Sequence, residues 1–246
     1  MRTARLEVSV DHTEAVLAAA RGGAERLELC SSLVDGGLTP SIGLVEWAVT
    51  SVKIPVYCMV RPRGGNFCYS DDEIDVMERD IRALQAAGAH GVVFGVLTPE
   101  RTVDAAAMRR LVHVAYPLPV VFHRAFDLAA DLSQALEDVI ASGAAILLTS
   151  GGAPSLEEGR AMVAKLIQQA GKRIQIMSGA GVRLHNAKRL WDELAIDTIH
   201  ASLRSPWPGG GDAGGVGIGS RDAESLYTVR EQDVRDLLAV LRPRGN

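Results

Sequence analysis

The run Leu6-Glu7-Val8-Ser9-Val10 is the first of eight short stretches of β-branched and apolar residues, and a helix-like stretch follows each of them. The other seven runs are Arg26–Cys30, Pro55–Val60, Gly91–Gly95, Pro119–His123, Ala145–Thr149, Arg173–Ser178 and Thr198–Ser202. Eight βα units in 246 residues predict an α/β fold, a single-domain (βα)8 barrel of the triosephosphate isomerase type. Because such barrels carry their working site at the carboxyl ends of the strands, we look for function there.

The domain plan follows from these runs. We expect residues 1–204 to form the barrel, 205–220 a glycine-rich loop at its mouth, and 221–246 a C-terminal helix that completes the barrel. Seven of the eleven residues from Gly209 to Gly219 are glycine, which suits either a mobile lid or a disordered connection. Helix starts are predicted at Ser70–Glu73, Asp131–Gln134 and Ser155–Glu158, where a capping residue precedes Glu or Gln by three positions.

Composition is that of an ordinary globular protein, with 47% hydrophobic and 23% charged residues. The net charge of −4 and the lack of a cationic run argue against nucleic acid as a partner. No apolar stretch is long enough to span a membrane, and the amino terminus lacks a secretory apolar segment. We therefore expect a cytoplasmic protein without a membrane partner. The three cysteines are too few for a disulfide framework, and a homo-oligomer stays open because the sequence shows no interface.

Alternation along the strands predicts which side chains enter the barrel. Residues two apart share a face, so Glu7 goes with Ser9 and Glu28 with Cys30. By the same count Cys58 faces the helices. The mouth is then expected to collect charged and imidazole groups, namely Glu7, Glu28, Arg61, Arg63, His123, Arg124 and His200. Such a group forms either a site for a small molecule or ion, or an ion-pair network that closes the barrel end.

Two glycine-containing loops follow late strands. Thr149-Ser150-Gly151 follows the sixth predicted strand, and Ser178-Gly179-Ala180-Gly181 follows the seventh. Main-chain amides in such loops bind phosphate or carboxylate, so Thr149, Ser150, Gly151, Ser178, Gly179 and Gly181 are predicted ligand-binding residues. The alternative is that these glycines only form turns.

The sequence lacks the residues that some common barrel enzymes need for their reactions. None of the four lysines lies at the carboxyl end of a predicted strand, which argues against a Schiff-base aldolase. The first strand has no His-x-His pair for an amidohydrolase metal centre. Cys30 is a candidate thiolate ligand for Cu(I), although a lone inward cysteine is more often part of the core.

Several motifs together resemble one family, the CutC family of copper-homeostasis proteins. The similarity runs from about Leu6 to Ser202, and its longest blocks are Arg61–Asp71 (RPRGGNFCYSD) and Phe122–Asp127 (FHRAFD). The resemblance implies a triosephosphate-isomerase-like barrel, a cytoplasmic location, and a role in copper tolerance or Cu(I) binding through cysteines that end the first two strands. Only Cys30 carries over, because Ser9 stands at the first position. The segment after the eighth strand, Ser205–Gly211, also departs from many relatives.

Two functions therefore remain. The first is copper homeostasis with Cu(I) bound at Cys30. The second is an enzyme that acts on a small phosphorylated or carboxylated substrate, with Arg61 and Arg63 holding the anion and Glu28 and His123 as acid or base. In the second, Asp127 would orient His123, and a hard-cation site of Glu7, Glu28, His123 and His200 is a variant. The structural alternatives are that His123 and His200 only bond across the barrel, Arg63 fastens a loop, and Asp127 caps one.

Overall fold

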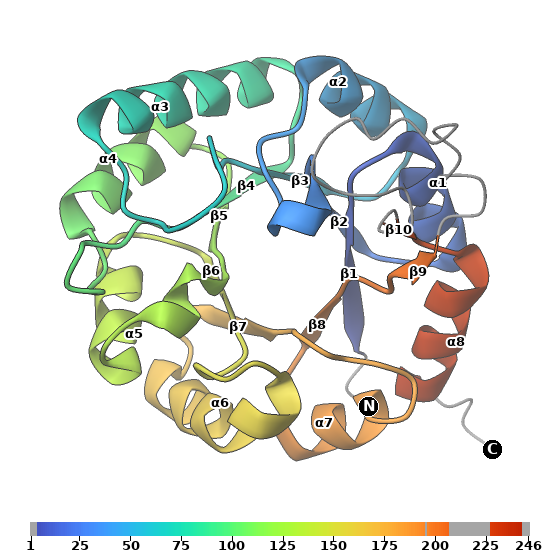
Figure 1. Ribbon diagram of the computed structural model, residues 1–246. Coiled ribbons are helices and arrows are strands. Elements are labelled where there is room, and N and C mark those ends of the chain that lie inside the picture. Colours follow the sequence, from blue (N-terminus) through green and yellow to red (C-terminus); the bar gives the residue numbers. More distant parts are fainter. Residues whose placement is uncertain (1–3, 195, 207–226, 243–246) are drawn as a thin grey trace, which may run out of the picture.

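Eight parallel strands close into a barrel in chain order, as the sequence predicts (Figure 1). The computed structural model describes residues 4–194, 196–206 and 227–242. The strands are β1 (Arg5–Val10), β2 (Arg26–Leu29), β3 (Val56–Met59), β4 (Gly91–Phe94), β5 (Val120–Phe122), β6 (Ile146–Thr149), β7 (Gln175–Ser178) and β8 (Thr198–Ala201). Several strands are one residue shorter at their carboxyl end than the predicted runs. Cys30 and His123, the last residues of two predicted runs, therefore directly follow β2 and β5.

The helices form a ring outside the strands (Figure 1). They are α1 (Thr13–Gly22), α2 (Ile42–Ser51), α3 (Asp71–Ala86), α4 (Ala105–Ala115), α5 (Leu132–Ala141), α6 (Leu156–Ala170), α7 (Ala187–Leu194) and α8 (Glu231–Leu241). The 3-10 helices η1 (Leu33–Asp35) and η2 (Arg124–Leu128) follow β2 and β5. The ring closes where α8 meets α1: a Cβ on Gly22 would lie 2.5 Å from Cβ of Val234, so only glycine permits this approach. Within the described residues, no helix is both long and apolar enough to cross a membrane.

The predicted helix starts are confirmed. The Ser70 hydroxyl accepts from the amide of Glu73, and the Glu73 carboxylate accepts from the amide of Ser70, which makes a complete capping box before α3. Asp131 and Ser155 cap α5 and α6 through side-chain oxygens that accept main-chain amides of the first helical turn. These local bonds satisfy amides that the first helical turn leaves free.

A short antiparallel pair lies beyond the barrel strands and was not predicted. It joins β9 (Ser205–Pro206) to β10 (Tyr227–Thr228). The glycine-rich part of the predicted 205–220 loop, residues 207–220, lies outside the described residues, as do 221–226 and 243–246 of the predicted C-terminal segment.

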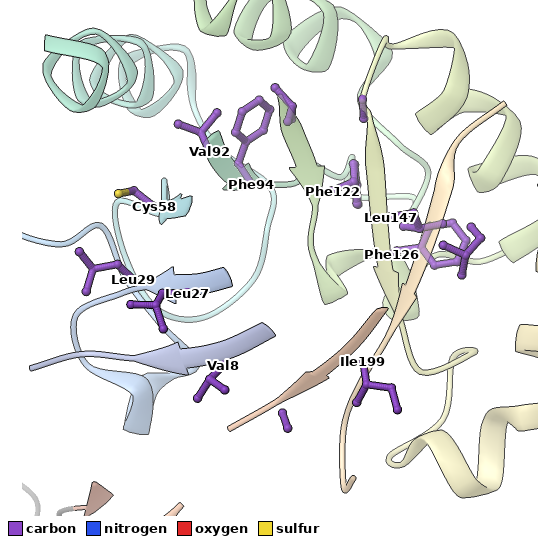
Figure 2. Close-up of a cluster of buried hydrophobic side chains, with 14 of the residues drawn as sticks. Val8, Leu27, Leu29, Cys58, Val92, Phe94, Phe122, Phe126, Leu147 and Ile199 are labelled. Atoms are coloured by element: carbon purple, nitrogen blue, oxygen red, sulfur yellow. The ribbon is translucent and has the colours of Figure 1, made fainter. Parts of the chain in front are cut away.

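The strands bury two separate layers of side chains. One layer faces the helices and includes Val8, Leu27, Cys58 and Ile199 (Figure 2). The other fills the barrel interior and consists of Cys30, Met59, Val93, Val121, Ile146, Leu148 and Met177. The predicted phase of the strands is therefore correct, with Cys58 outside and Cys30 inside. Charged groups that share the inner phase must meet inside the barrel or at its mouth.

Candidate functional site

Glu7, Glu28 and His200 meet at the junction of β1, β2 and β8. Glu7 and His200 are partners in the register of β1 and β8, while Glu28 is opposite Ser9 across β1 and β2. Nδ1 of His200 lies 2.7 Å from Oε1 of Glu7, and its Nε2 lies 3.7 Å from Oε2 of Glu28. All three residues belong to the set that the sequence predicted for the mouth.

Arg26 joins this group and was missed by the sequence analysis. Its Nε bonds Oε2 of Glu7, its Nη2 lies 3.0 Å from Sδ of Met177, and its guanidinium lies 4.6 Å above the ring of Tyr57. The signal was available, because Arg26 is two residues before Glu28 and so shares its face of the strand. The buried group therefore contains two carboxylates, one guanidinium and one imidazole.

The surroundings of these groups separate their pKa values. Burial alone would raise the pKa of Glu7, but the hydrogen bond from His200 and the charge of Arg26 outweigh it and lower that pKa. Burial, together with the charge of Glu7, raises the pKa of Glu28 to about 6. Burial alone would lower the pKa of His200, but the negative charge of Glu28 and the hydrogen bond to Glu7 outweigh it and raise that pKa. The surroundings thus favour the charged forms of Glu7 and His200, whereas Glu28 changes its charge at a pH of about 6.

The same three residues offer ligand atoms within 4.8 Å of one another, the spacing of a metal site. His123, the fourth predicted member of a hard-cation site, is not in this group. Arg26 already neutralises Glu7, and a protonated His200 adds a second positive charge. A metal ion bound here would have to compete with the guanidinium of Arg26 for Glu7 and displace any proton from His200, since histidine binds metals as the neutral imidazole.

His123 is buried, with 5% of its surface exposed. The main-chain amide of Ala125 donates to Nδ1 at 3.3 Å, whereas Nε2 has no partner among the described residues. Burial, assisted by the charge of Arg61, lowers the pKa of His123 to about 3. The neutral ring therefore carries its proton on Nε2. The ring of Phe67 stands edge-on to it at 4.8 Å.

Asp127 does not orient His123, contrary to the role that the enzyme hypothesis gave it. Its carboxylate accepts from Oγ1 of Thr149 at 2.5 Å, from the amide and hydroxyl of Ser150, and from the amide of Gly152. It also pairs with Arg124 at 2.8 Å. Asp127 thus fastens the loop after β6 to η2, whereas the alternative role expected from the sequence was to cap the loop after the fifth strand. Thr149 and Ser150, which were predicted to bind a ligand, donate hydrogen bonds to Asp127 instead.

Arg61 and Arg63 hold loops at the mouth. Nη1 of Arg61 donates to the carbonyls of Asp35 and Gly37 at 2.8 and 3.0 Å, and Nη2 donates to Gly65 at 3.0 Å. Arg63 pairs with Glu73 at 2.5 Å and donates to the carbonyl of Cys68. Arg61 therefore joins the loops after β2 and β3, and the fastening role proposed for Arg63 is what its contacts show.

The predicted glycine loops differ in their surroundings. A Cβ on Gly151 would lie 2.5 Å from the carbonyl oxygen of Gly159, so this glycine allows α6 to pack closely. A Cβ on Gly179 would lie 3.0 Å from the carbonyl oxygen of His200, which explains glycine beside β8. The hydroxyl of Ser178 is buried without a partner among the described residues. Gly181 has φ of +71° and lines the mouth cavity.

A cavity of about 220 Å³ occupies the mouth of the barrel. Glu28, His123 and His200 line it together, with Met59 and Leu148 as apolar neighbours. Three arginines also line it: Arg124, Arg183 and Arg204. Arg124 was predicted at the mouth, whereas Arg183 and Arg204 were not, although their positions after β7 and β8 were a signal for it. A concave, partly apolar space with positive charge suits a small anionic molecule.

Cys30 is not among the residues that line this cavity, although Glu28 and Met59 beside it are. It is fully buried, and its thiol donates to Oε2 of Glu28 at 3.9 Å. Burial and the charge of Glu28 raise the pKa of the thiol well above its usual range. Met59 is its neighbour, since a Cβ on Gly37 would meet Sγ of Cys30 at 3.0 Å and Cε of Met59 at 3.3 Å. One thiol and one thioether therefore lie together under the loop that Arg61 holds.

The sequence and the fold of this chain are both similar to those of known proteins. A sequence profile of the CutC family matches residues 4–205. The copper homeostasis protein cutC homolog of Mus musculus is 43% identical over 231 residues, 93% of this chain and 85% of that protein. A family protein CutC of Chromobacterium violaceum is 44% identical over 237 residues, 96% of each chain. The crystal structure of CutC from Streptococcus agalactiae superposes with a TM-score of 0.76 at 31% identity, covering 81% of this chain and 98% of that one.

Proposed function

Because this chain belongs to the CutC family and carries an acid–base group at its barrel mouth, we propose that it is an enzyme that transfers a proton on a small anionic molecule. The observation that carries the proposal is that Glu28, His123 and His200 line one cavity together with three arginines. Glu28 is the group that exchanges the proton. A carboxyl with a pKa near 6 suits this task, since it gains and loses a proton close to neutral pH.

The other charged groups have supporting roles in this proposal. His200 and Glu7 position Glu28 and set the balance of charge around it. Arg183 and Arg204 attract the anion; each donates to one main-chain carbonyl, of Val182 and Leu33 respectively, which fixes the guanidinium at the cavity. Arg61 maintains the shape of the mouth through its loop contacts.

Ligand-observed NMR with a panel of small phosphates and carboxylates tests this function, followed by turnover assays on the molecules that bind. We expect Arg183→Ala and Arg204→Ala to weaken binding, and Arg189→Ala on α7, which pairs with Glu157 away from the cavity, to leave it unchanged. Glu28→Gln is expected to bind the ligand and lose turnover by about 100-fold. Ligand affinity that is unchanged in both Arg183→Ala and Arg204→Ala would contradict the proposal, as would turnover by Glu28→Gln at the wild-type rate.

A second candidate function is copper homeostasis with Cu(I) as cargo in a cytoplasmic protein, and it has its own support. Two relatives, from mouse and human, are named copper homeostasis proteins. Sulfur ligands suit Cu(I), and Cys30 and Met59 lie side by side under Gly37. The sulfur ligands are limited to this thiol and thioether, because Ser9 supplies no second thiol. Cys30 must also lose a proton to bind Cu(I) as a thiolate, and its burial opposes that loss.

An anaerobic Cu(I) competition titration against a chelator tests the second function. We expect one equivalent to bind the wild-type protein, and Cys30→Ser and Met59→Leu to lose it. Cys68→Ser is the matched control, because Cys68 is a half-buried thiol on the loop after β3. Equal binding by wild type and Cys30→Ser would exclude a copper site at this cysteine.

A further inference from the structure

We propose that the reaction at the mouth is an enolisation, in which Glu28 removes a proton from the carbon next to a carbonyl and Nε2–H of His123 stabilises the oxygen that becomes negative. The inference rests on the proposed function and names its substrate class: a small hydroxycarbonyl compound or 2-oxo acid with a phosphate or carboxylate group. Its basis is the unpartnered donor of His123 in the same cavity as Glu28.

The donor on His123 is defined by its local contacts. The amide of Ala125 donates to Nδ1, so the proton of the neutral ring must be on Nε2. That nitrogen is buried, and the described residues give it no acceptor. Buried donors are nearly always paired, so this one points to an acceptor that a ligand brings. A carbonyl oxygen is such an acceptor, and it becomes a stronger one as negative charge develops on it.

The neutral state of His123 makes it a suitable donor to an enolate oxygen. Burial next to Arg61 keeps the ring uncharged at any pH near neutrality. A neutral imidazole donates a hydrogen bond without passing its proton to the oxygen, so the ring keeps the same state throughout the reaction. The same use of a neutral histidine is known in an unrelated barrel isomerase.

Glu28 and His123 approach the cavity from different sides. Glu28 is on β2, and His123 directly follows β5, three strands further around the ring of eight. A molecule held between them can present a C–H bond to the carboxylate and its carbonyl oxygen to the imidazole. Met59 and Leu148 form apolar parts of the wall, which limits the water that competes for both groups.

The step balances without a cofactor. The carboxylate of Glu28 takes the proton from carbon, the electron pair of the C–H bond becomes the double bond of the enolate, and the carbonyl π pair moves to oxygen. Return of the proton to the same carbon restores the carbonyl compound with its hydrogen exchanged. In a 2-hydroxycarbonyl compound the hydroxyl proton can pass to the neighbouring enolate oxygen, and return of the carbon-bound proton to the former carbonyl carbon then isomerises the molecule. No lysine is among the described residues lining the cavity, so an imine cannot take the place of the hydrogen-bonded carbonyl.

Hydrogen exchange in heavy water tests the inference. Pyruvate, hydroxypyruvate and dihydroxyacetone phosphate are incubated with the protein in D2O, and ¹H NMR follows loss of the signals next to the carbonyl. We expect the wild-type protein to catalyse exchange in at least one of them. Glu28→Gln should lower the rate by about 100-fold, and His123→Leu by a similar factor.

Two further variants distinguish the donor role from a structural one. His123→Gln supplies an amide N–H and is expected to recover part of the rate that His123→Leu loses. His113→Gln changes an exposed histidine on α4 and should leave exchange unchanged. Thermal denaturation confirms that each variant folds, and identical purification of Glu28→Gln controls for contaminating isomerases.

The same NMR samples report whether each compound binds. Compounds that bind in competition with one another at the mouth without any exchange would overturn the enolisation and leave the proposed function standing. If no compound binds or exchanges, both proposals fail. Exchange that persists in Glu28→Gln and His123→Leu would also overturn the inference, since these two groups would then not be the base and the donor.

Discussion

His200 and Glu7 face each other across the first and last strands of the barrel, with Nδ1 of His200 2.7 Å from Oε1 of Glu7. Parallel hydrogen bonds between β1 and β8 close the barrel at this point, and the side-chain contact lies on its inner face. Closure of the fold and assembly of the charged site therefore depend on the same pair of strands. A change that separates β1 from β8 should disturb both.

Replacement of Glu28 by Gln is expected to change how stability depends on pH. The pKa of Glu28 is raised from 4.5 to about 6, so between these values the native state binds more protons than the unfolded chain. The contribution of this group to stability is then present at low pH and is lost as pH rises through about 6. Glu28→Gln has no carboxyl group to titrate here, so its stability does not fall in this way. The free energy of unfolding of the variant, relative to that of the wild type, should therefore rise by about 1–2 kcal/mol between pH 4 and pH 7. Urea unfolding at a series of pH values measures this, and a difference independent of pH would contradict it.

Arg26→Met should destabilise the protein by about 3 kcal/mol, because it leaves the buried carboxylate of Glu7 without its guanidinium. The double variant Glu7→Gln/Arg26→Met should recover part of this loss, since no buried charge then lacks its partner. Lys188→Met, which breaks an exposed pair with Asp192, is the matched control and should cost less than about 1 kcal/mol. Denaturant unfolding of the wild type, Glu7→Gln, Arg26→Met and the double variant gives the coupling energy between Glu7 and Arg26, with Lys188→Met measured beside them. A coupling of zero would mean that Arg26 does not stabilise Glu7.

Arg61→Ala is expected to cost about 3 kcal/mol, because the carbonyls of Asp35, Gly37 and Gly65 lose a charged donor. Arg61→Lys should be intermediate, since one ammonium group cannot reproduce the planar guanidinium that spans two loops. Amide hydrogen exchange should quicken in the loops after β2 and β3 in both variants. If exchange there is unchanged, the loops are held by other contacts and a direct role for Arg61 in binding the anion becomes the better account.

The three thiols should react in a defined order with iodoacetamide in the native protein. Cys68 is half-buried, whereas Cys30 and Cys58 are fully buried. Burial raises the pKa of Cys58 to about 12 and that of Cys30 well above its usual range, so neither forms the reactive thiolate near neutral pH. Mass spectrometry is expected to find rapid modification of Cys68 alone, and of all three in denaturant. Early labelling of Cys30 would show that the mouth opens to it.

Much of the fold follows from local patterns. The eight strand runs, the three helix caps and the inward phase of Glu28, Cys30 and His200 were all predictable, because alternation and capping depend on residues only a few positions apart. Membership of the CutC family was visible in the RPRGG and FHRAFD blocks for the same reason, since each is a continuous stretch of chain. Arg26 could have been found by this rule and was missed.

Partner choice at the mouth could not be read from the sequence. The pairs that define the site join distant positions: Glu7 and His200 are 193 residues apart, and Arg26 and Met177 are 151 apart. Asp127 illustrates the difference, because its place four residues after His123 suggested a partner for the imidazole, yet the fold directs its carboxylate to the loop after β6.

The sequence by itself determined the eight βα units, the face of each strand on which its charges lie and the family, since each of these depends on short-range periodicity or contiguous motifs. The tertiary structure alone decided that Arg61 and Asp127 fasten loops while Glu28 and His123 share a cavity, and that Nε2 of His123 has no partner among the described residues. The physical reason is closure of the barrel. Strand register and loop packing bring together groups far apart in the chain, and burial then sets which of them are charged.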